Sequence, residues 1–337
     1  MSAALSTGMA TSIGSLPHTD ADAAASLVLA RHPDLPAAPQ LPVRSQREGM
    51  IAQAAHGIPG VTVFDDGTVR ADPDAVESAA VNGVPVDASV RPPEAGGLLH
   101  FLSRIDGRRE PVKVQLTGPV TLGLALTRAG VPSRAAFAVA AEAAQARGRA
   151  LLEQVARHAP GAPVVVFLDE PSLAVISHPG FPLPPHAVVD LLTSALASLH
   201  DASATGVHCC GVTEWRVVLE AHPDILSLPV ALAPSLDAAE IGSFLGRGGW
   251  VAWGVVPTDA PMSDDVTFLW RRLVGAWSDL VRGGCPALLL RERALVTPAC
   301  GLAGHGASQA DRALRLTAQL GERVREQAAR RRLTIGA

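Results

Sequence analysis

The sequence predicts an α/β protein built as a single (β/α)8 TIM-type barrel with an insertion after strand two. Strand-like apolar runs, each followed by turn residues and then a helical pattern, recur along the 337 residues. Such alternation is typical of a parallel sheet. Eight runs favour closure into a barrel over an open doubly wound sheet. No linker or internal repeat divides the chain, so we expect one barrel over 1–337.

The predicted elements follow one another in a regular order. The strands are 10–15, 40–44, 112–118, 164–170, 206–211, 225–230, 250–256 and a run from 287 to 301 that begins with ALLL. The clearest helices are 133–157, 185–200, 213–221, 236–245, 264–282 and 308–333. Only 59–110 breaks the rhythm, with a hairpin signal at Asp66-Gly67 and then a stretch rich in Pro and Gly. We expect this insertion to lie over one end of the barrel.

The composition argues against several classes of protein. Apolar runs stay well below the roughly 18 residues that a membrane helix needs, and the N-terminus lacks the basic start and apolar block of a secretory signal. A net charge of −4 argues against nucleic-acid binding. We therefore expect a cytoplasmic protein that binds neither membranes nor nucleic acid. Its four cysteines suggest thiol or metal chemistry rather than disulfides.

A histidine and two cysteines carry the strongest chemical signal. Successive side chains of a strand point to opposite faces, so His208 and Cys210 share one side of GVHCCG, and Cys209 faces the other. Cys300 follows the last strand, and strand ends converge in a barrel. Zn²⁺ binds N and S ligands tetrahedrally, and three protein ligands leave one position for a substrate. The alternative is that the cysteines are buried small hydrophobes and His208 is a core histidine.

Other polar residues lie at or near the ends of predicted strands. Asp169 and Glu170 follow the apolar run VVVF, where a carboxylate either caps a neighbouring turn or helix or lies in the site. In the site, Asp169 could receive an ammonium group while Glu170 points away. The TSIGSLP run offers the Ser15 hydroxyl and nearby backbone N–H groups to an anion. Lys113 stands near the start of its strand, so we expect no catalytic role for it.

Five runs together resemble a known family: TSIGSLP, VKVQLTGPVTL, VVVFLDEPSL, GVHCCG and TPACGL. In this order they look like the C-terminal catalytic barrel of cobalamin-independent methionine synthases, in a superfamily that also includes uroporphyrinogen decarboxylases. The resemblance covers nearly the whole chain. It implies a (β/α)8 barrel that transfers a methyl group to the sulfur of homocysteine.

The resemblance also implies roles for particular residues. Ser15 and the backbone around Ile13 match the substrate carboxylate site, and Asp169 matches a group that holds the substrate amine. Asp259 stands where the family has a histidine and could act as a proton donor or relay. Zn²⁺ would lower the pKa of the substrate thiol so that it binds as the nucleophilic thiolate. The implied zinc ligands are His208, Cys210 and Cys300.

The chain departs from the family at several positions. Pro229 stands where the family has a glutamate zinc ligand, so the metal should hold a thiolate more tightly and leave it less nucleophilic. Arg44 stands near the family's acidic residue after strand two, or Gln46 if the alignment shifts by two positions. Arginine would attract a carboxylate, phosphate or sulfonate instead of an ammonium group. Ala125 lies near the position of the tryptophan on which the folate ring stacks.

We therefore expect a zinc-dependent S-methyltransferase of the methionine synthase type. Its partners would be a small thiol, homocysteine by resemblance, and a methyl donor, either a methyl-folate or a methylated corrinoid protein. Three alternatives stay open. One is zinc-dependent alkyl transfer to another thiol such as coenzyme M, which Pro229 and Arg44 favour. The others are a zinc- or corrinoid-binding barrel without turnover, and decarboxylation of a porphyrinogen, which needs a wide cationic cleft and no metal.

Overall fold

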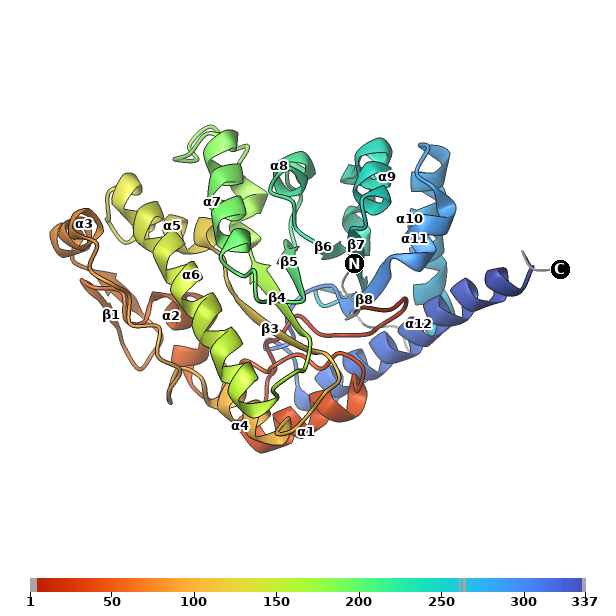
Figure 1. Cartoon of the computed structure of the whole chain (residues 1–337), viewed down its shortest axis with the longest axis horizontal. Coiled ribbons are helices and arrows are strands. Elements are labelled where there is room, and N and C mark those ends of the chain that lie inside the picture. The colour runs from red at the N-terminus through yellow and green to blue at the C-terminus, as the bar shows by residue number, and fades with distance from the viewer. Residues whose placement is uncertain (1–4, 261, 263–264, 335–337) are drawn as a thin grey trace.

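The centre of the fold is a curled parallel sheet (Figure 1). The computed structural model describes residues 5–260, 262 and 265–334. The sheet has six strands in the order β3-β4-β5-β6-β7-β8, which is also their order in the chain. The architecture is therefore α/β, with a half-barrel of parallel strands. The strands are β3 (Val112–Thr117), β4 (Val164–Asp169), β5 (Ala204–His208), β6 (Ile225–Pro229), β7 (Trp250–Val256) and β8 (Ala294–Pro298).

The predicted strands 10–15 and 40–44 do not form as strands. Two extended segments pair with the sheet edges as isolated parallel bridges instead of ladders: Ala10 with Val296 of β8, and Ala37 with Lys113 of β3. A third bridge, between Ser15 and Gln40, joins the segments to each other. Prolines recur every third residue from 33 to 42, and each removes a backbone donor that a strand would use. The structure therefore shows a six-stranded half-barrel, and a closed eight-stranded barrel is not seen in the described residues.

The last predicted strand is shorter than expected because its first part is helical. The ALLL run forms α11 (Ala287–Glu292), and β8 begins only at Ala294. Leu290 is buried in this helix whereas Leu288 is 42% exposed. A run of four apolar residues suits either a helix or a strand, so periodicity alone could not separate them.

Helices cover the outer face of the sheet (Figure 1). The outward side chains of the strands, such as Val114, Val166 and Leu226, pack with the helices in one large apolar core. All six helices expected from the sequence form, with ends that differ by a few residues. The helices around the sheet are α1 (Ala21–Arg31), α5 (Pro119–Arg128), α6 (Ser133–His158), α7 (Pro185–Ala197), α8 (Trp215–Glu220), α9 (Ala238–Gly246), α10 (Val266–Arg282) and α12 (Ala307–Thr334).

The segment 59–110 contains the expected hairpin and two helices. Strands β1 (Val61–Val63) and β2 (Val69–Ala71) pair antiparallel on either side of Asp66-Gly67. Helix α3 (Pro73–Asn82) packs against α6, and α4 (Gly96–Arg104) packs against α1. Figure 1 shows the hairpin and α3 at one edge of the molecule, beside α5 and α6. The short helix α2 (Met50–Ala55) precedes this segment and contacts both hairpin strands.

The inner face of the sheet changes from apolar to polar along the strands. Near the strand starts, Val165, Phe167, Ala204, Ile225 and Leu295 pack into a separate apolar cluster. At the strand ends the same face carries polar groups. Register places Thr117, Asp169, His208 and Ser227 side by side on four neighbouring strands. The apolar end closes the interior, and the polar end positions the candidate site.

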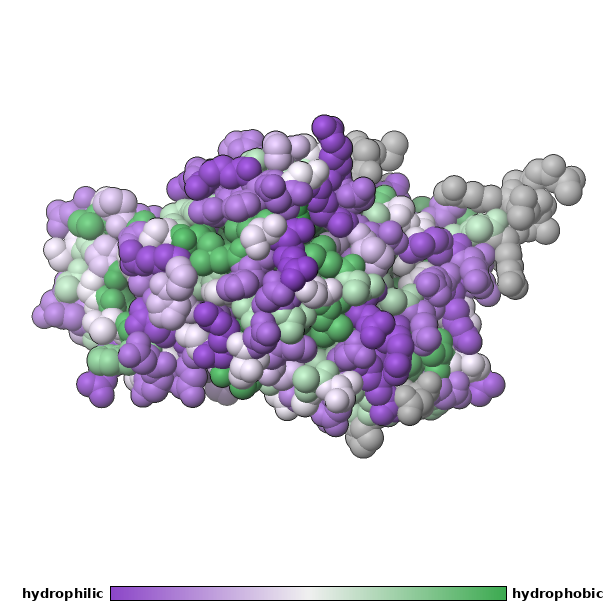
Figure 2. Space-filling view, turned by 90° about the horizontal axis from the view of Figure 1, so that it is seen from below, coloured by the Kyte–Doolittle hydropathy of each residue, from purple (hydrophilic) through white to green (hydrophobic). Residues whose placement is uncertain are grey.

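The surface is largely polar on the face shown in Figure 2, where hydrophobic residues form separate patches between hydrophilic ones. Among the described helices, none has both the length and the apolar character required to cross a membrane.

Candidate metal centre

The structure brings His208, Cys210 and Cys300 together. One potential ligand atom from each residue lies within 4.8 Å of the other two. A tetrahedral zinc ion separates its N and S ligands by roughly 3.5–4 Å, so small side-chain movements would complete the geometry. His208 ends β5, and Cys300 follows β8, three strand positions away. In a flat sheet, strands three positions apart would be separated by about 14 Å. The curl of the sheet therefore brings His208 and Cys300 together.

His208 is held in one orientation by a neighbouring strand. Its Nδ1 lies 3.0 Å from the hydroxyl oxygen of Ser227, the next residue across in β6. The other ring nitrogen, Nε2, is buried and has no hydrogen-bond partner. Metal-bound histidines usually carry such a partner on the nitrogen that does not bind the ion. The imidazole is therefore arranged as a metal ligand would be, and an unpaired buried nitrogen fits poorly with a purely structural role.

The two cysteines of the group form a polarised pair. A hydrogen bond between the thiols lowers the pKa of Cys210, and the same bond, together with burial, raises the pKa of Cys300 to about 12. Cys209 behaves differently: it is buried in the outer apolar core, and burial raises its pKa to about 11. The expected alternation is confirmed, since adjacent cysteines face opposite sides of the sheet.

The two acidic residues at the end of β4, Asp169 and Glu170, point in different directions, as expected. Asp169 is buried beside His208, its Oδ1 has no hydrogen-bond partner, and burial raises its pKa although Lys113 and His208 oppose the shift. Glu170 points to helix α5, where its carboxylate accepts hydrogen bonds from the backbone N–H groups of Val120 and Thr121. Glu170 is therefore a helix cap, whereas Asp169 keeps a buried carboxylate oxygen without a hydrogen-bond partner.

The N-terminal segment lies against the cysteine loop. The backbone carbonyl of Ser15 accepts a hydrogen bond from Leu302 N at 2.9 Å, and a Cβ atom at Gly301 would collide with the Ser15 hydroxyl. The Ile13 carbonyl already accepts a hydrogen bond from Lys113 Nζ at 2.7 Å. Lys113 lies near the start of β3, as expected, but its buried ammonium group supports the segment that carries Ser15. Burial lowers its pKa to about 8.

Two predicted site residues, Arg44 and Asp259, make no described contact with His208, Cys210 or Cys300. Arg44 donates to Glu48 Oε1 at 2.8 Å, so its charge is paired within its own loop. Asp259 lies in an exposed segment after β7. Pro229 ends β6 and lies opposite Gly254, and within the described residues no Asp or Glu joins the three ligand candidates.

Sequence reasoning missed Ser227 and the structural role of Lys113. Ser227 is the only polar residue in the run ILSLPV, and its position two residues before the strand end places it on the inner face. That polar residue on an inner position of a buried strand was the available signal. The structural role of Lys113 was harder to predict, because the Ile13 carbonyl that it contacts is 100 residues away in the chain.

The comparisons with known proteins support the fold. No protein-family model matches the sequence, and the comparison with curated proteins finds no significant match. A crystal structure from Listeria monocytogenes, provisionally assigned as a vitamin-B12-independent methionine synthase, is similar in fold with a TM-score of 0.54. The match covers 91% of this chain and 86% of that chain at 12% identity. At that identity the likeness defines the α/β architecture and nothing finer.

Proposed function

We propose that this protein is a zinc-dependent S-methyltransferase of the methionine synthase type that methylates the thiol of homocysteine. One observation carries the proposal: His208, whose buried Nε2 has no hydrogen-bond partner, lies together with the thiols of Cys210 and Cys300. The fold likeness to a methionine synthase structure supports it. We also propose that the six-stranded sheet and its two bridged segments act together as a (β/α)8 barrel.

Different residues would bind the metal ion, the substrate amine and the substrate carboxylate. His208, Cys210 and Cys300 would hold Zn²⁺, which would supply a thiolate from the bound substrate thiol at neutral pH. Asp169 offers a buried carboxylate oxygen without a partner to the ammonium group of homocysteine. Ser15, beside the Cys300 loop, would orient the substrate carboxylate. Fixing the acceptor in this way supplies proximity and orientation.

The methyl donor and the proton-handling residue belong to the same proposal. The donor would be a methyl-folate or a methylated corrinoid protein. Asp259, exposed after β7, would handle a proton near the opening of the site, and Arg44 would contact an anionic group of a substrate only after leaving Glu48. The four free cysteines suit a reducing compartment, so we expect this methyltransferase in the cytoplasm.

A second candidate function is zinc-dependent alkyl transfer to another thiol, such as coenzyme M. The observation that favours it is the lack of a carboxylate beside the three ligand candidates in the described chain, with Pro229 at the end of β6. With two thiolates and a neutral imidazole, the zinc site would be formally uncharged and would hold the substrate thiolate more tightly. The pairing of Arg44 with Glu48 argues the other way, since it occupies the charge that a sulfonate would need.

X-ray absorption of the zinc-loaded protein would distinguish these functions. We expect the zinc–sulfur coordination number to rise by one on addition of homocysteine and to stay unchanged with coenzyme M. Methyl transfer to homocysteine from a methyl-folate or a methylated corrinoid protein would complete the proof. A rise only with coenzyme M would assign the second function. Zinc binding without a response to either thiol would indicate a metal-binding barrel without turnover.

A further inference from the structure

A cavity of about 60 Å³ lies in the wall of the fold, and none of the three ligand candidates lines it. It forms where the extended segment 36–41 parts from β3. Ala38 N still donates to Lys113 O of β3, but Gln40 N turns to Gly14 O. The resulting space is lined by Gln40 and by Gln115 and Thr117 of β3. Helices α2 and α6 and the loop before α4 close it from outside.

One side of the cavity carries an incompletely bonded carboxylate. Glu94 is only 5% exposed, and its Oε1 accepts a hydrogen bond from Arg47 Nε at 2.9 Å. His56 Nδ1 lies 3.4 Å from the same oxygen. The other oxygen, Oε2, is buried and has no partner. A buried carboxylate oxygen without a donor lowers the stability of the fold. A hydrogen-bond donor bound at this side of the cavity would remove that cost.

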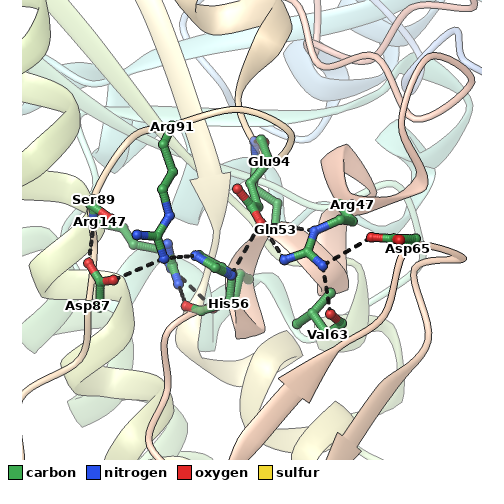
Figure 3. Close-up of polar contacts among 11 residues, drawn as sticks. Arg47, Gln53, His56, Val63, Asp65, Asp87, Ser89, Arg91, Glu94 and Arg147 are labelled. Atoms are coloured by element: carbon green, nitrogen blue, oxygen red, sulfur yellow. Dashed lines mark hydrogen bonds and ion pairs between the residues drawn. The ribbon is translucent and has the colours of Figure 1, made fainter.

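None of the donors described around Glu94 bonds to its Oε2, so a donor for this oxygen would have to come from a bound molecule. Figure 3 shows His56 between Glu94 and Arg91, with Arg147 on the side away from Arg47. Arg91 donates to His56 Nε2 at 2.9 Å and to Asp87 at 3.1 Å. Arg147 donates to the backbone carbonyls of Ala54 and His56. Arg91 and Arg147 therefore each bond to other acceptors, while Glu94 Oε2 is buried without a partner.

We propose that this cavity is a second small-molecule site and that it binds a primary ammonium group through Glu94 Oε2. An ammonium group has three donors, and its charge would complement the carboxylate. The volume accommodates only a few non-hydrogen atoms, since one water needs roughly 10–15 Å³. The group belongs either to a short free amine or to a small α-amino acid, whose carboxylate would lie toward Arg147.

Ligand-observed NMR with ethylamine, glycine and propionate tests the site. Ethylamine carries only the ammonium group, glycine carries both charged groups, and propionate carries no ammonium group. We expect ethylamine or glycine to bind with a Kd on the order of millimolar, which is typical of ligands this small. Propionate should not bind. Binding of ethylamine alone would identify a free-amine site, binding of glycine alone an amino-acid site, and binding of both a site for the shared ammonium group.

Two variants and one control locate the binding. Glu94→Gln keeps the oxygen that Arg47 holds and replaces Oε2 with an amide donor, so we expect binding to weaken about tenfold or more. Ala88→Leu, from the loop that lines the cavity, should block the space without touching the carboxylate. Asp65→Asn is the control, because Asp65 contacts Arg47 from a fully exposed position and should leave binding unchanged.

Three results would overturn the proposal: neither amine binds, propionate binds as well as the amines, or both cavity variants bind like the wild-type protein. If Glu94→Gln fails to fold, Ala88→Leu alone decides between the cavity and another surface. This test is independent of the zinc proposal, because it measures binding and needs neither metal nor turnover.

Discussion

Cys209 and Cys210 are adjacent in the chain but lie in opposite environments. Cys209 packs in the apolar core between the sheet and its helices, whereas Cys210 belongs to the group with His208 and Cys300. The period of two in an extended chain produces this difference. Neighbouring substitutions can therefore separate metal binding from packing.

Replacing either proposed sulfur ligand should remove zinc. Cys210→Ser and Cys300→Ser each substitute a hydroxyl, a far poorer zinc ligand than a thiolate, so we expect zinc affinity to fall at least about tenfold. Competition with a chromophoric chelator measures the affinity. Cys209→Ala is the matched control and should retain zinc, because its side chain faces away from the group. Loss of zinc in Cys209→Ala, or retention in both serine variants, would contradict the assignment.

Removing the partner of His208 should weaken zinc binding while leaving the ligands in place. In Ser227→Ala, Nδ1 loses its hydrogen bond and the ring loses its fixed orientation. Outer partners of this kind typically contribute about 10–100-fold to metal affinity. The same chelator competition tests it, with Ser103→Ala as an exposed serine control. An unchanged affinity in Ser227→Ala would mean that His208 does not bind through Nε2.

At the level of whole elements, helix α1 is fastened to α12 by a buried histidine. His32, which caps the end of α1, lies with Nε2 3.0 Å from the Leu314 carbonyl of α12. Burial lowers its pKa to about 4, whereas a free histidine has a pKa near 6.5. The folded protein therefore keeps this imidazole neutral through a range in which the unfolded chain takes up a proton.

This helix contact should make stability depend on pH in one direction. Between pH 6.5 and pH 4 the unfolded state binds the extra proton, so stability present above pH 6.5 is lost as the pH falls. We expect wild type to lose roughly 2 kcal/mol more than His32→Gln between pH 7 and pH 5, measured by urea unfolding. His200→Gln, at an exposed position, should follow the wild type. Parallel curves for wild type and His32→Gln would refute the prediction.

At the level of the whole molecule, the junction between the two sheet edges is the weakest part of the central structure. The edges β3 and β8 are joined through extended segments that pair as isolated bridges, while neighbouring strands of the sheet pair over three or more residues. Fewer backbone hydrogen bonds must break to open the junction than to open the sheet. Local opening is expected where such contacts are few.

Native-state hydrogen exchange should resolve this difference. The amides of Thr11 and Leu16, which bond to Val296 O and Gln40 O, should exchange with a free energy on the order of 2 kcal/mol or more below that of the amides of β4 and β5. The bonded amides of β4 and β5 act as the internal reference. Equal free energies would mean that the junction opens only with global unfolding.

The sequence predicts much of this architecture. The buried runs of β4, β6 and β7 are short and mostly apolar, and the helices between them are periodic, so both are determined by local pattern. The alternation in GVHCCG likewise placed His208 and Cys210 on one side. The predicted strand 40–44 was wrong because the prolines from 33 to 42 allow an extended chain but remove the donors of a ladder. The predicted strand 10–15 contains no proline, and it forms only isolated bridges, at Ala10 and Ser15.

The sequence by itself determined which residues are chemically able to hold a metal and that strands alternate with helices around a parallel sheet. Only the tertiary structure decided that β5 and β8 curl close enough to join His208 with Cys300, and that Ser227 orients the ring. It alone created the cavity beside Glu94. The physical reason is that propensity and alternation act within a few residues, whereas sheet curl and side-chain pairing depend on contacts between distant segments.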